Sequence, residues 1–113
     1  MSKTSNIEFK VKMDENMVPE KIDWIADGKH ESSCKAIMTS VWDEKDSNTL
    51  RMDLWTKEMM VEEMRHFCVQ TIITMADTFE RATNDSKSAE DLREFGKNFG
   101  IQLGVIKEGP KAT

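Results

Sequence analysis

The side chains of this chain that are best suited to metal chemistry are two histidines and two cysteines, which lie in two short clusters. His30 and Cys34 belong to the segment HESSC, and His66 and Cys68 belong to the segment HFC. Imidazole and thiolate are ligands that zinc accepts. However, residues two apart on a helix point in different directions, and neither cluster has the CxxC spacing of structural zinc sites. We therefore expect no metal site, a buried Cys68 thiol and an exposed His66 imidazole.

The sequence evidence for a catalytic nucleophile, a calcium site or a phosphate-binding loop is equally weak. Cys34 or Cys68 with a histidine could act as a nucleophile, but the sequence contains no recognisable nucleophile signature and no acid at motif spacing. The acidic turn at Asp43, Glu44 and Asp46 lacks the pattern and the central glycine of a calcium-binding EF-hand loop. A glycine-rich phosphate loop is also missing from the sequence. We expect no catalytic residue, no cofactor and no enzymatic activity.

The composition is typical of a soluble globular domain. The 113 residues are 38% hydrophobic and 33% charged, with a net charge of −5, and we expect one domain over residues 1–113 with frayed ends at 1–5 and 108–113. The acidic balance argues against a nucleic-acid partner. The first residues carry no apolar export signal and no run has transmembrane length, so we expect no membrane insertion. Two cysteines form no disulfide framework, which favours a cytoplasmic location.

In the first half of the chain, alternating apolar and polar residues predict four strands, which precede any helix. Alternation with a period of two places one side of each strand toward a core. The polar segment from Asp27 to Ser33 is expected to be a loop, and EKDSN is expected to be the turn of a hairpin. The predicted strands cover about residues 6–14, 20–27, 35–43 and 49–55.

Two helices follow, at about residues 60–83 and 88–106. Ser88 and Asp91 have the spacing of a capping box at the start of the second helix, and Gly109-Pro110 would end it. The segregated order predicts an α+β fold, in which a four-stranded antiparallel sheet is covered on one face by the helical pair. Apolar residues at helical spacing predict the buried stripe of the first helix: Val61, Met64, Cys68, Ile72, Met75, Phe79 and Ala82.

Three glycines give the second helix a strip without side chains. Gly96, Gly100 and Gly104 repeat every four residues, although glycine costs a helix about 1 kcal/mol relative to alanine. A close approach of another backbone to this strip would compensate for that loss of helix stability. The approaching backbone would belong either to the first helix or to another subunit. The alternative is that the helix frays after Gly100.

The sheet face that the helices leave uncovered is the other candidate for an interaction surface. We assign Ile37, Val41 and Trp55 to this face, where they would form an exposed apolar patch. Exposed apolar patches of this kind mark interfaces. We therefore expect the protein to form a homo-oligomer.

Several strings of the sequence resemble the gliding-motility protein GldC family of the Bacteroidetes. The resemblance extends over about residues 3–100, and it is carried by the strings VPEKIDWIAD, AIMTSVWD, LRMDLWTKEM, VEEM and TMADTFERAT. Members of that family are small soluble proteins without an export signal, and no catalytic or cofactor residue is carried over from them.

The resemblance implies a non-enzymatic cytoplasmic accessory protein that is associated with bacterial gliding motility. Its partners would be gliding-motility or secretion-associated proteins, bound through protein–protein contacts. A second hypothesis stays open, because four strands followed by two helices is an order similar to that of the export chaperone SecB. Under that hypothesis the protein binds unfolded or export-bound polypeptides, although a shared fold alone does not establish a function.

Overall fold

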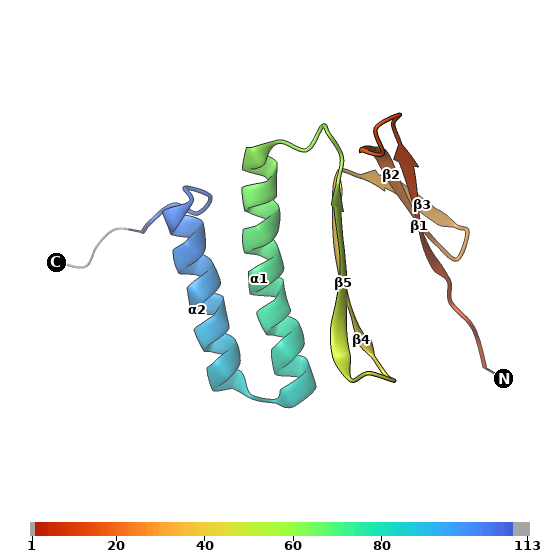
Figure 1. Ribbon diagram of the computed structural model, residues 1–113. Coiled ribbons are helices and arrows are strands. Elements are labelled where there is room, and N and C mark those ends of the chain that lie inside the picture. Colours follow the sequence, from red (N-terminus) through yellow and green to blue (C-terminus); the bar gives the residue numbers. More distant parts are fainter. Residues whose placement is uncertain (1, 110–113) are drawn as a thin grey trace. The chain divides into compact units, whose positions relative to one another are not determined.

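The computed structural model describes residues 2–109, which form five strands, two helices and two compact units (Figure 1). The first unit, residues 2–59, holds all the strands, and the second unit, residues 60–109, holds both helices. The fold is therefore α+β, as predicted. The sheet prediction is wrong in one respect, because the strands of residues 2–59 form a three-stranded and a two-stranded sheet. Residue 1 and residues 110–113 of the predicted frayed ends lie outside the described residues.

The three-stranded sheet is antiparallel, with the order β1 (Ile7–Met13), β2 (Pro19–Ala26) and β3 (His30–Cys34). Phe9 lies opposite Trp24, and Val11 lies opposite Ile22. Residues that lie opposite each other share a face, so the alternation in β1 and β2 builds one apolar face. Ile22 is fully buried.

Strand β3 lies in the segment that was predicted to be a loop. The string HESSC has no apolar alternation that would predict a strand. Its strand conformation comes from the hydrogen-bonded ladder to β2, and its residues before Cys34 are exposed. The missed signal is the dipeptide Asp27-Gly28. Both residues have positive φ, 54° and 67°, which is the backbone of the type I′ turn that joins antiparallel strands.

The second sheet is the predicted hairpin of β4 (Ala36–Asp43) and β5 (Asn48–Trp55). Only Lys35 separates β3 from β4. A chain needs a turn of at least about two residues to pair with the strand before it, so β4 cannot fold back against β3. The strand ladder therefore changes partner at Lys35, where the Lys35 carbonyl accepts a 2.8 Å hydrogen bond from the Thr56 N–H.

Helix α1 (Val61–Thr83) and helix α2 (Ser86–Gln102) form an antiparallel hairpin in the second unit. Asn84, with φ 59°, ends α1 in the left-handed conformation. Asp85 caps α2 by accepting hydrogen bonds from the Ser88 N–H at 3.0 Å and from the Ser88 hydroxyl at 2.7 Å. The predicted capping box at Ser88 is therefore wrong, because Ser88 is the donor to a cap that lies three residues earlier.

Helix α2 ends four residues before its predicted limit of 106. Gly104 has φ +76°, a left-handed conformation that glycine adopts without strain. The N–H groups of Val105 and Gly104 donate to the carbonyls of Gly100 and Ile101 at 2.8 and 3.1 Å. This pair of bonds is a Schellman motif, which ends a helix and satisfies its last carbonyls.

The two helices meet at the glycine strip. A Cβ atom built on Gly96 would lie 2.8 Å from Ile73 Cγ1 and 3.1 Å from Ile72 Cγ2, and one built on Gly100 would lie 3.1 Å from Val69 Cγ1. Gly96 thus contacts α1 of the same chain, which is one of the two neighbours considered above, whereas Gly100 lies against both Val69 of α1 and Ile106, which follows α2. The missing side chains bring the two backbones close together.

The buried stripe of α1 differs from the predicted one. Val69 and Ala76 are the buried residues of this helix, whereas Val61, Met75 and Phe79 of the predicted stripe are exposed. The helix has apolar residues on more than one side, and helical spacing alone does not say which side meets the glycines. The packing partner selects the side.

Gly96→Ala tests this close approach, because helix propensity and packing predict opposite signs. Propensity alone would stabilise the helix by about 1 kcal/mol. The stiff branched side chains of Ile72 and Ile73 leave no room for a methyl group, and overpacking costs about 1–3 kcal/mol. We expect a net loss of roughly 1 kcal/mol in the free energy of unfolding by urea. Exposed Lys97→Ala is the control, with no loss expected, and a more stable Gly96→Ala protein would contradict the packing.

Candidate interaction surfaces

The β4–β5 hairpin presents a face of aliphatic side chains. The cross-strand pairs Ile37–Leu54 and Val41–Leu50 lie on it, and Met52 lies between them opposite Thr39. We call this set of five apolar side chains the aliphatic face. Ile37 is buried, but the exposed fractions of Val41, Leu50 and Met52 are 56%, 51% and 45%.

The opposite face of the hairpin carries two tryptophans. Trp55 lies opposite Ala36, and Trp42 lies opposite Thr49. Trp42 and Trp55 define the tryptophan face, and their exposed fractions are 68% and 56%. The grouping of Trp55 with Ile37 and Val41 on one face is therefore wrong. Counting across the turn would have shown it, because the pairing of Asp43 with Asn48 sets the parity of β5.

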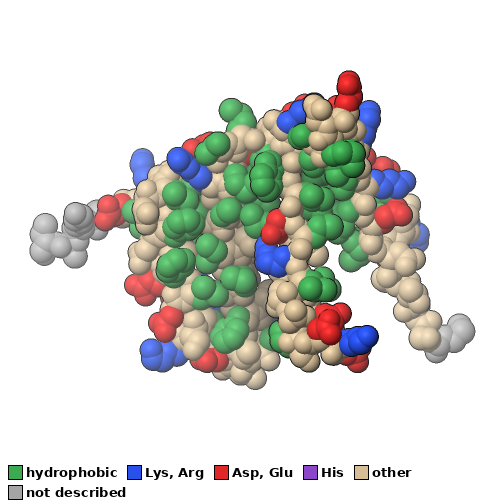
Figure 2. Space-filling view, viewed as in Figure 1, with side chains coloured by type: hydrophobic (Ala, Val, Ile, Leu, Met, Phe, Trp, Pro, Cys, Tyr) green, Lys and Arg blue, Asp and Glu red, His purple; other side chains and the backbone are tan. Residues whose placement is uncertain are grey.

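The hairpin is thus apolar and exposed on both sides. Figure 2 shows that apolar side chains reach the surface of the protein in many places and are not confined to an interior. An isolated two-stranded hairpin is at best marginally stable in water, and exposed apolar patches of this kind mark interaction sites. The structure therefore offers the hairpin as the main candidate surface of residues 2–59.

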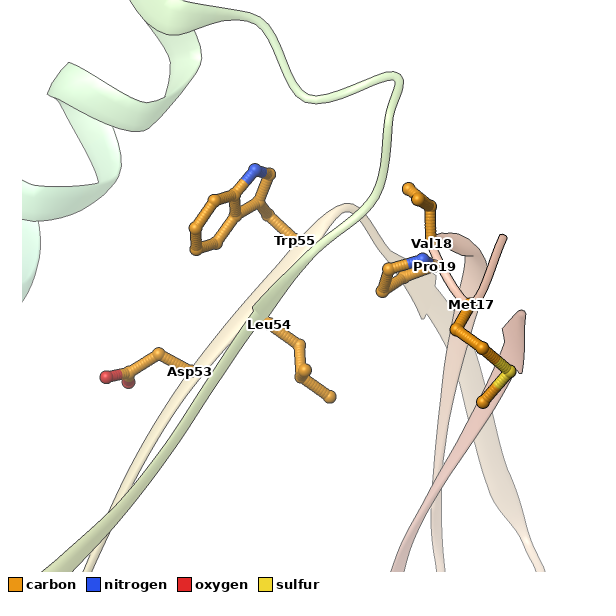
Figure 3. Close-up of a pocket in the computed structure, with 6 residues that line it drawn as sticks. All are labelled: Met17, Val18, Pro19, Asp53, Leu54 and Trp55. Carbon is orange, nitrogen blue, oxygen red and sulfur yellow. The ribbon is translucent and has the colours of Figure 1, made fainter. Parts of the chain in front are cut away.

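An apolar groove lies beside the hairpin in the same unit. It is lined by Met17, Val18 and Pro19 of the β1–β2 connection and by residues 53–55 of β5. Figure 3 shows the Leu54 side chain directed toward this connection, while Asp53 and Trp55 project from the opposite side of β5. Met17 has φ 61° and is 72% exposed, so the turn holds a flexible apolar side chain at the rim of the groove.

Asp14 holds the β1–β2 connection in place. Its Oδ1 accepts hydrogen bonds from the N–H groups of Asn16 and Val18 at 2.8 and 2.9 Å, and its Oδ2 lies 3.2 Å from Lys57 Nζ. The Val18 N–H and the Lys57 ammonium lower the pKa of the Asp14 carboxyl below its usual value. The Lys57 N–H also donates to the Pro19 carbonyl at 3.1 Å, so the end of β5 is tied to the start of β2.

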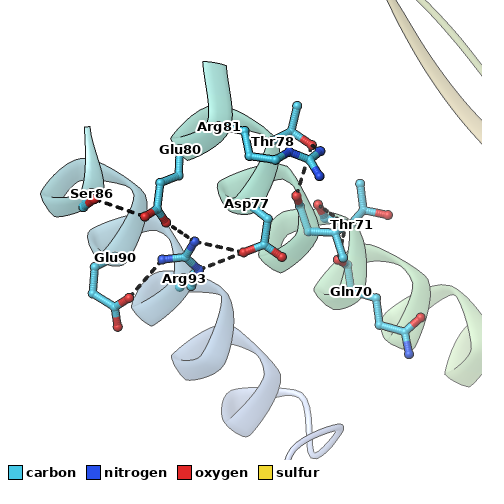
Figure 4. A network of polar contacts seen from close by, with 10 residues as sticks. Gln70, Thr71, Asp77, Thr78, Glu80, Arg81, Ser86, Glu90 and Arg93 are labelled. Atoms are coloured by element: carbon cyan, nitrogen blue, oxygen red, sulfur yellow. Dashed lines mark hydrogen bonds and ion pairs between the residues drawn. The ribbon is translucent and has the colours of Figure 1, made fainter. Parts of the chain in front are cut away.

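The most highly charged cluster of the second unit surrounds Arg93. Its guanidinium, on α2, bonds Asp77 at 2.9 Å, Glu90 at 3.1 Å and Glu80 at close range. Figure 4 shows Arg93 between the two helices, with Asp77 and Glu80 reaching it from α1. Hydrogen bonds from Arg93 and then from Ser86 lower the pKa of Glu80 from its usual 4.5. These bonds join α1 to α2 and occupy the Arg93 guanidinium, and we call the cluster of Arg93, Asp77, Glu80 and Glu90 the Arg93 clamp.

The histidines and cysteines do not assemble into a site. The His30 ring lies against the Trp24 ring in a tilted arrangement, with the centroids 4.7 Å apart. Burial raises the pKa of the Cys34 thiol, which lowers its thiolate fraction. His66, on α1, lies beside Glu62 with Nε2 and Oε1 4.0 Å apart. Among residues 2–109, no group of three or more histidine, cysteine or acidic side chains is placed to hold a metal ion.

The predicted glycine surface is divided between two roles. Gly96 and Gly100 are buried against side chains of their own unit, and Gly104 is exposed at the end of α2. Sequence reasoning missed Trp42, Leu50 and Met52 as surface residues. The signal for them was present in β4, which carries apolar residues on both parities, and in β5, whose Leu50, Met52 and Leu54 alternate with polar residues.

These observations define a small α+β protein whose candidate sites are exposed apolar surfaces. The sequence matches the family described as "Gliding motility-associated protein GldC-like" over residues 19–104, and the chain belongs to that family. No curated protein and no solved structure matches it. Within the described range, neither helix is long and apolar enough to cross a membrane.

Arg93→Gln should change how stability depends on pH. The folded-state pKa of Glu80 is lowered, so its stabilising contribution is present above the usual 4.5 and is lost as the pH falls through the lowered value. We expect the variant to melt at a lower temperature than the native protein at pH 7, with the gap closing as the pH falls below 4.5. Arg81→Gln is the control, because within residues 2–109 the Arg81 guanidinium bonds only the Thr78 hydroxyl, at 3.3 Å. A difference in melting temperature between Arg93→Gln and the native protein that stays the same at every pH would contradict this role of Arg93.

Proposed function

We propose that this GldC-like protein is a non-enzymatic accessory protein of bacterial gliding motility, which acts in the cytoplasm by binding other proteins. Membership of the family supports the association with gliding. The observation that carries the proposed mode of action is the β4–β5 hairpin, which exposes apolar side chains on both faces.

The tryptophan face is the better anchor for a specific partner. Tryptophan is the residue type most enriched among interface residues that dominate binding energy. Trp42 is followed by Asp43, the last residue of β4, and then by the hairpin turn, where the charged residues Lys45 and Asp46 are exposed. An apolar centre with a polar rim is the usual composition of a protein–protein interface. The partners that we propose are gliding-motility or secretion-associated proteins.

A chaperone-like role is the second candidate, and the groove at Met17, Pro19 and Leu54 favours it. Methionine adapts to differently shaped apolar ligands because its side chain is unbranched and polarizable. A groove of this kind would accept apolar segments of unfolded or export-bound polypeptides, as in the SecB-like hypothesis. The two candidates differ in which surface binds and in how many proteins are bound.

Replacement of the exposed hairpin side chains tests the leading proposal. Val41→Ser combined with Trp42→Ser should lower the capture of a specific partner from the native cell by tenfold or more, since loss of a central tryptophan costs about 2 kcal/mol or more. Both side chains are exposed, so the melting temperature should change little. Capture after cross-linking, with bound proteins identified by mass spectrometry, provides the measurement.

Lys45→Ser combined with Asp46→Ser serves as the matched control on the adjoining turn, and it should capture as the native protein does. One or two motility or secretion components at fixed ratio, lost with the Val41/Trp42 variant, would support the accessory role. A broad set of unfolded chains, lost instead with Met17→Ser, would support the chaperone. Capture unaffected by either substitution would refute both assignments of the surface.

A further inference from the structure

The outer edge of β5 has no strand partner among residues 2–109, because β5 pairs with β4 alone. Every residue of β5 except Leu54 is exposed, whereas β4 is buried or half-buried over Ala36–Thr39. An open strand edge offers a row of unpaired N–H and C=O groups that can pair with another strand. A two-stranded hairpin is at best marginally stable alone, and it gains stability from further strands or from packing against a helix; a strand added at this edge would supply the first of these.

We propose that this edge pairs with β5 of a second copy of the chain. The two strands would run antiparallel about a two-fold axis at Met52, and the two hairpins would form one four-stranded sheet. A two-fold interface requires a surface that is complementary to itself. The side-chain pattern of β5 meets this requirement.

The charges of β5 provide the complementarity. Arg51 and Asp53 flank Met52 in sequence and lie together on the tryptophan face, opposite Ser40 and Met38. In the single chain they bond each other, with Nη2–Oδ1 at 2.8 Å and Nε–Oδ2 at 3.2 Å. With Met52 opposite Met52, each Arg51 lies opposite Asp53 of the second copy. Opposite charges placed directly across two strands stabilise the pair, and like charges destabilise it. Four charges of alternating sign would then surround the axis.

The same charges select one register. A pairing centred on Arg51 would place two arginines opposite each other, and a pairing centred on Asp53 would place two aspartates opposite each other. A slip by a single residue would turn each strand over and place Arg51 opposite Met52, so that the faces no longer match. Of the registers centred on Arg51, Met52 and Asp53, only the one centred on Met52 places Arg51 opposite Asp53 while keeping the faces matched.

The apolar pattern agrees with this register. Leu50 would lie opposite Leu54 of the second copy, so the aliphatic faces of the two hairpins would join into one continuous surface. Pairing along an edge leaves the faces of the sheet open, and the tryptophan faces would likewise lie on one common side. The dimer would thus double both surfaces.

The edge strand β1 is less suited to this pairing. It carries Lys10 and Lys12 on its polar face, and lysines on an edge strand discourage pairing with other chains. Its register with β2 is also irregular between Lys12 and Met13. Strand β1 belongs to a sheet that already has three strands, so that sheet has less need of a partner.

A mixing experiment with two charge variants tests the proposal. In the Arg51→Asp chain both positions are acidic, and in the Asp53→Arg chain both are basic. Neither variant can keep the bond within its own strand, and in each homodimer like charges would face one another. We expect each variant alone to self-associate on the order of 100-fold more weakly than the native protein, and an equimolar mixture to form a heterodimer.

Sedimentation equilibrium gives the masses, with 13.0 kDa for one chain. A native dimer, two monomeric variants and a dimeric mixture would support the proposal, and the recovery on mixing would exclude misfolding as the cause. A monomeric native protein at about 100 μM would overturn it. So would variants that dimerise as tightly as the native chain, or a mixture that stays monomeric.

A disulfide at the axis tests the register independently. In a chain with Cys34→Ser and Cys68→Ala, Met52→Cys should form an interchain disulfide on oxidation. Leu50→Cys is the matched control, because its counterpart would lie about 13 Å away along the strand, and a disulfide requires Cα atoms within about 7 Å. Cross-linking through Leu50→Cys alone, or none through Met52→Cys, would contradict a pairing centred on Met52.

Discussion

The one-residue connection at Lys35 is the constraint on which the first unit depends. Strands β3 and β4 follow each other with no room for a turn, so the chain cannot pair them with each other. The ladder must change partner, and the strands divide into sheets of three and two. As a consequence, the hairpin of β4 and β5 has too few strands to bury its own apolar residues, and the surfaces of interest follow from that shortage.

The helical unit is stabilised in a different way. Its helices approach closely where Gly96 and Gly100 present no side chain, and the Arg93 clamp joins them at a polar position. Packing without side chains requires a compensating gain, since each glycine weakens the helix that contains it. The close contact with Val69, Ile72 and Ile73 is that gain. Gly96 and Gly100 therefore serve the interior of this unit.

The proposed role and the proposed dimer both use the same hairpin but different parts of it. Pairing through the β5 edge uses backbone groups and the charges of Arg51 and Asp53. Binding of another protein uses the faces, which edge pairing leaves open. A protein can have a specific function through binding surfaces that are joined in a fixed geometry. Membership of the GldC-like family associates the protein with gliding motility.

Much of the fold could be predicted from the sequence, because the period of the apolar residues is a local property of the chain. Alternation located β1, β2, β4 and β5, and helical spacing located α1 and α2. Strand β3 escaped prediction because HESSC has no apolar period, and its conformation comes from hydrogen bonds to β2. The end of α2 was placed too late because an apolar period does not show a left-handed glycine at position 104.

The sequence by itself determined the α+β class, the hairpin, the absence of catalytic motifs and the resemblance to a gliding-motility family. Tertiary structure alone decided which side of α1 meets the glycines, since that choice depends on the shape of α2. It also decided that Trp55 lies on the opposite face from Ile37, since cross-strand register sets the parity of each residue. The periodicity of apolar residues is a local property of the sequence. The face on which a residue lies and the segment that it packs against are decided only when segments that are distant in the sequence pair.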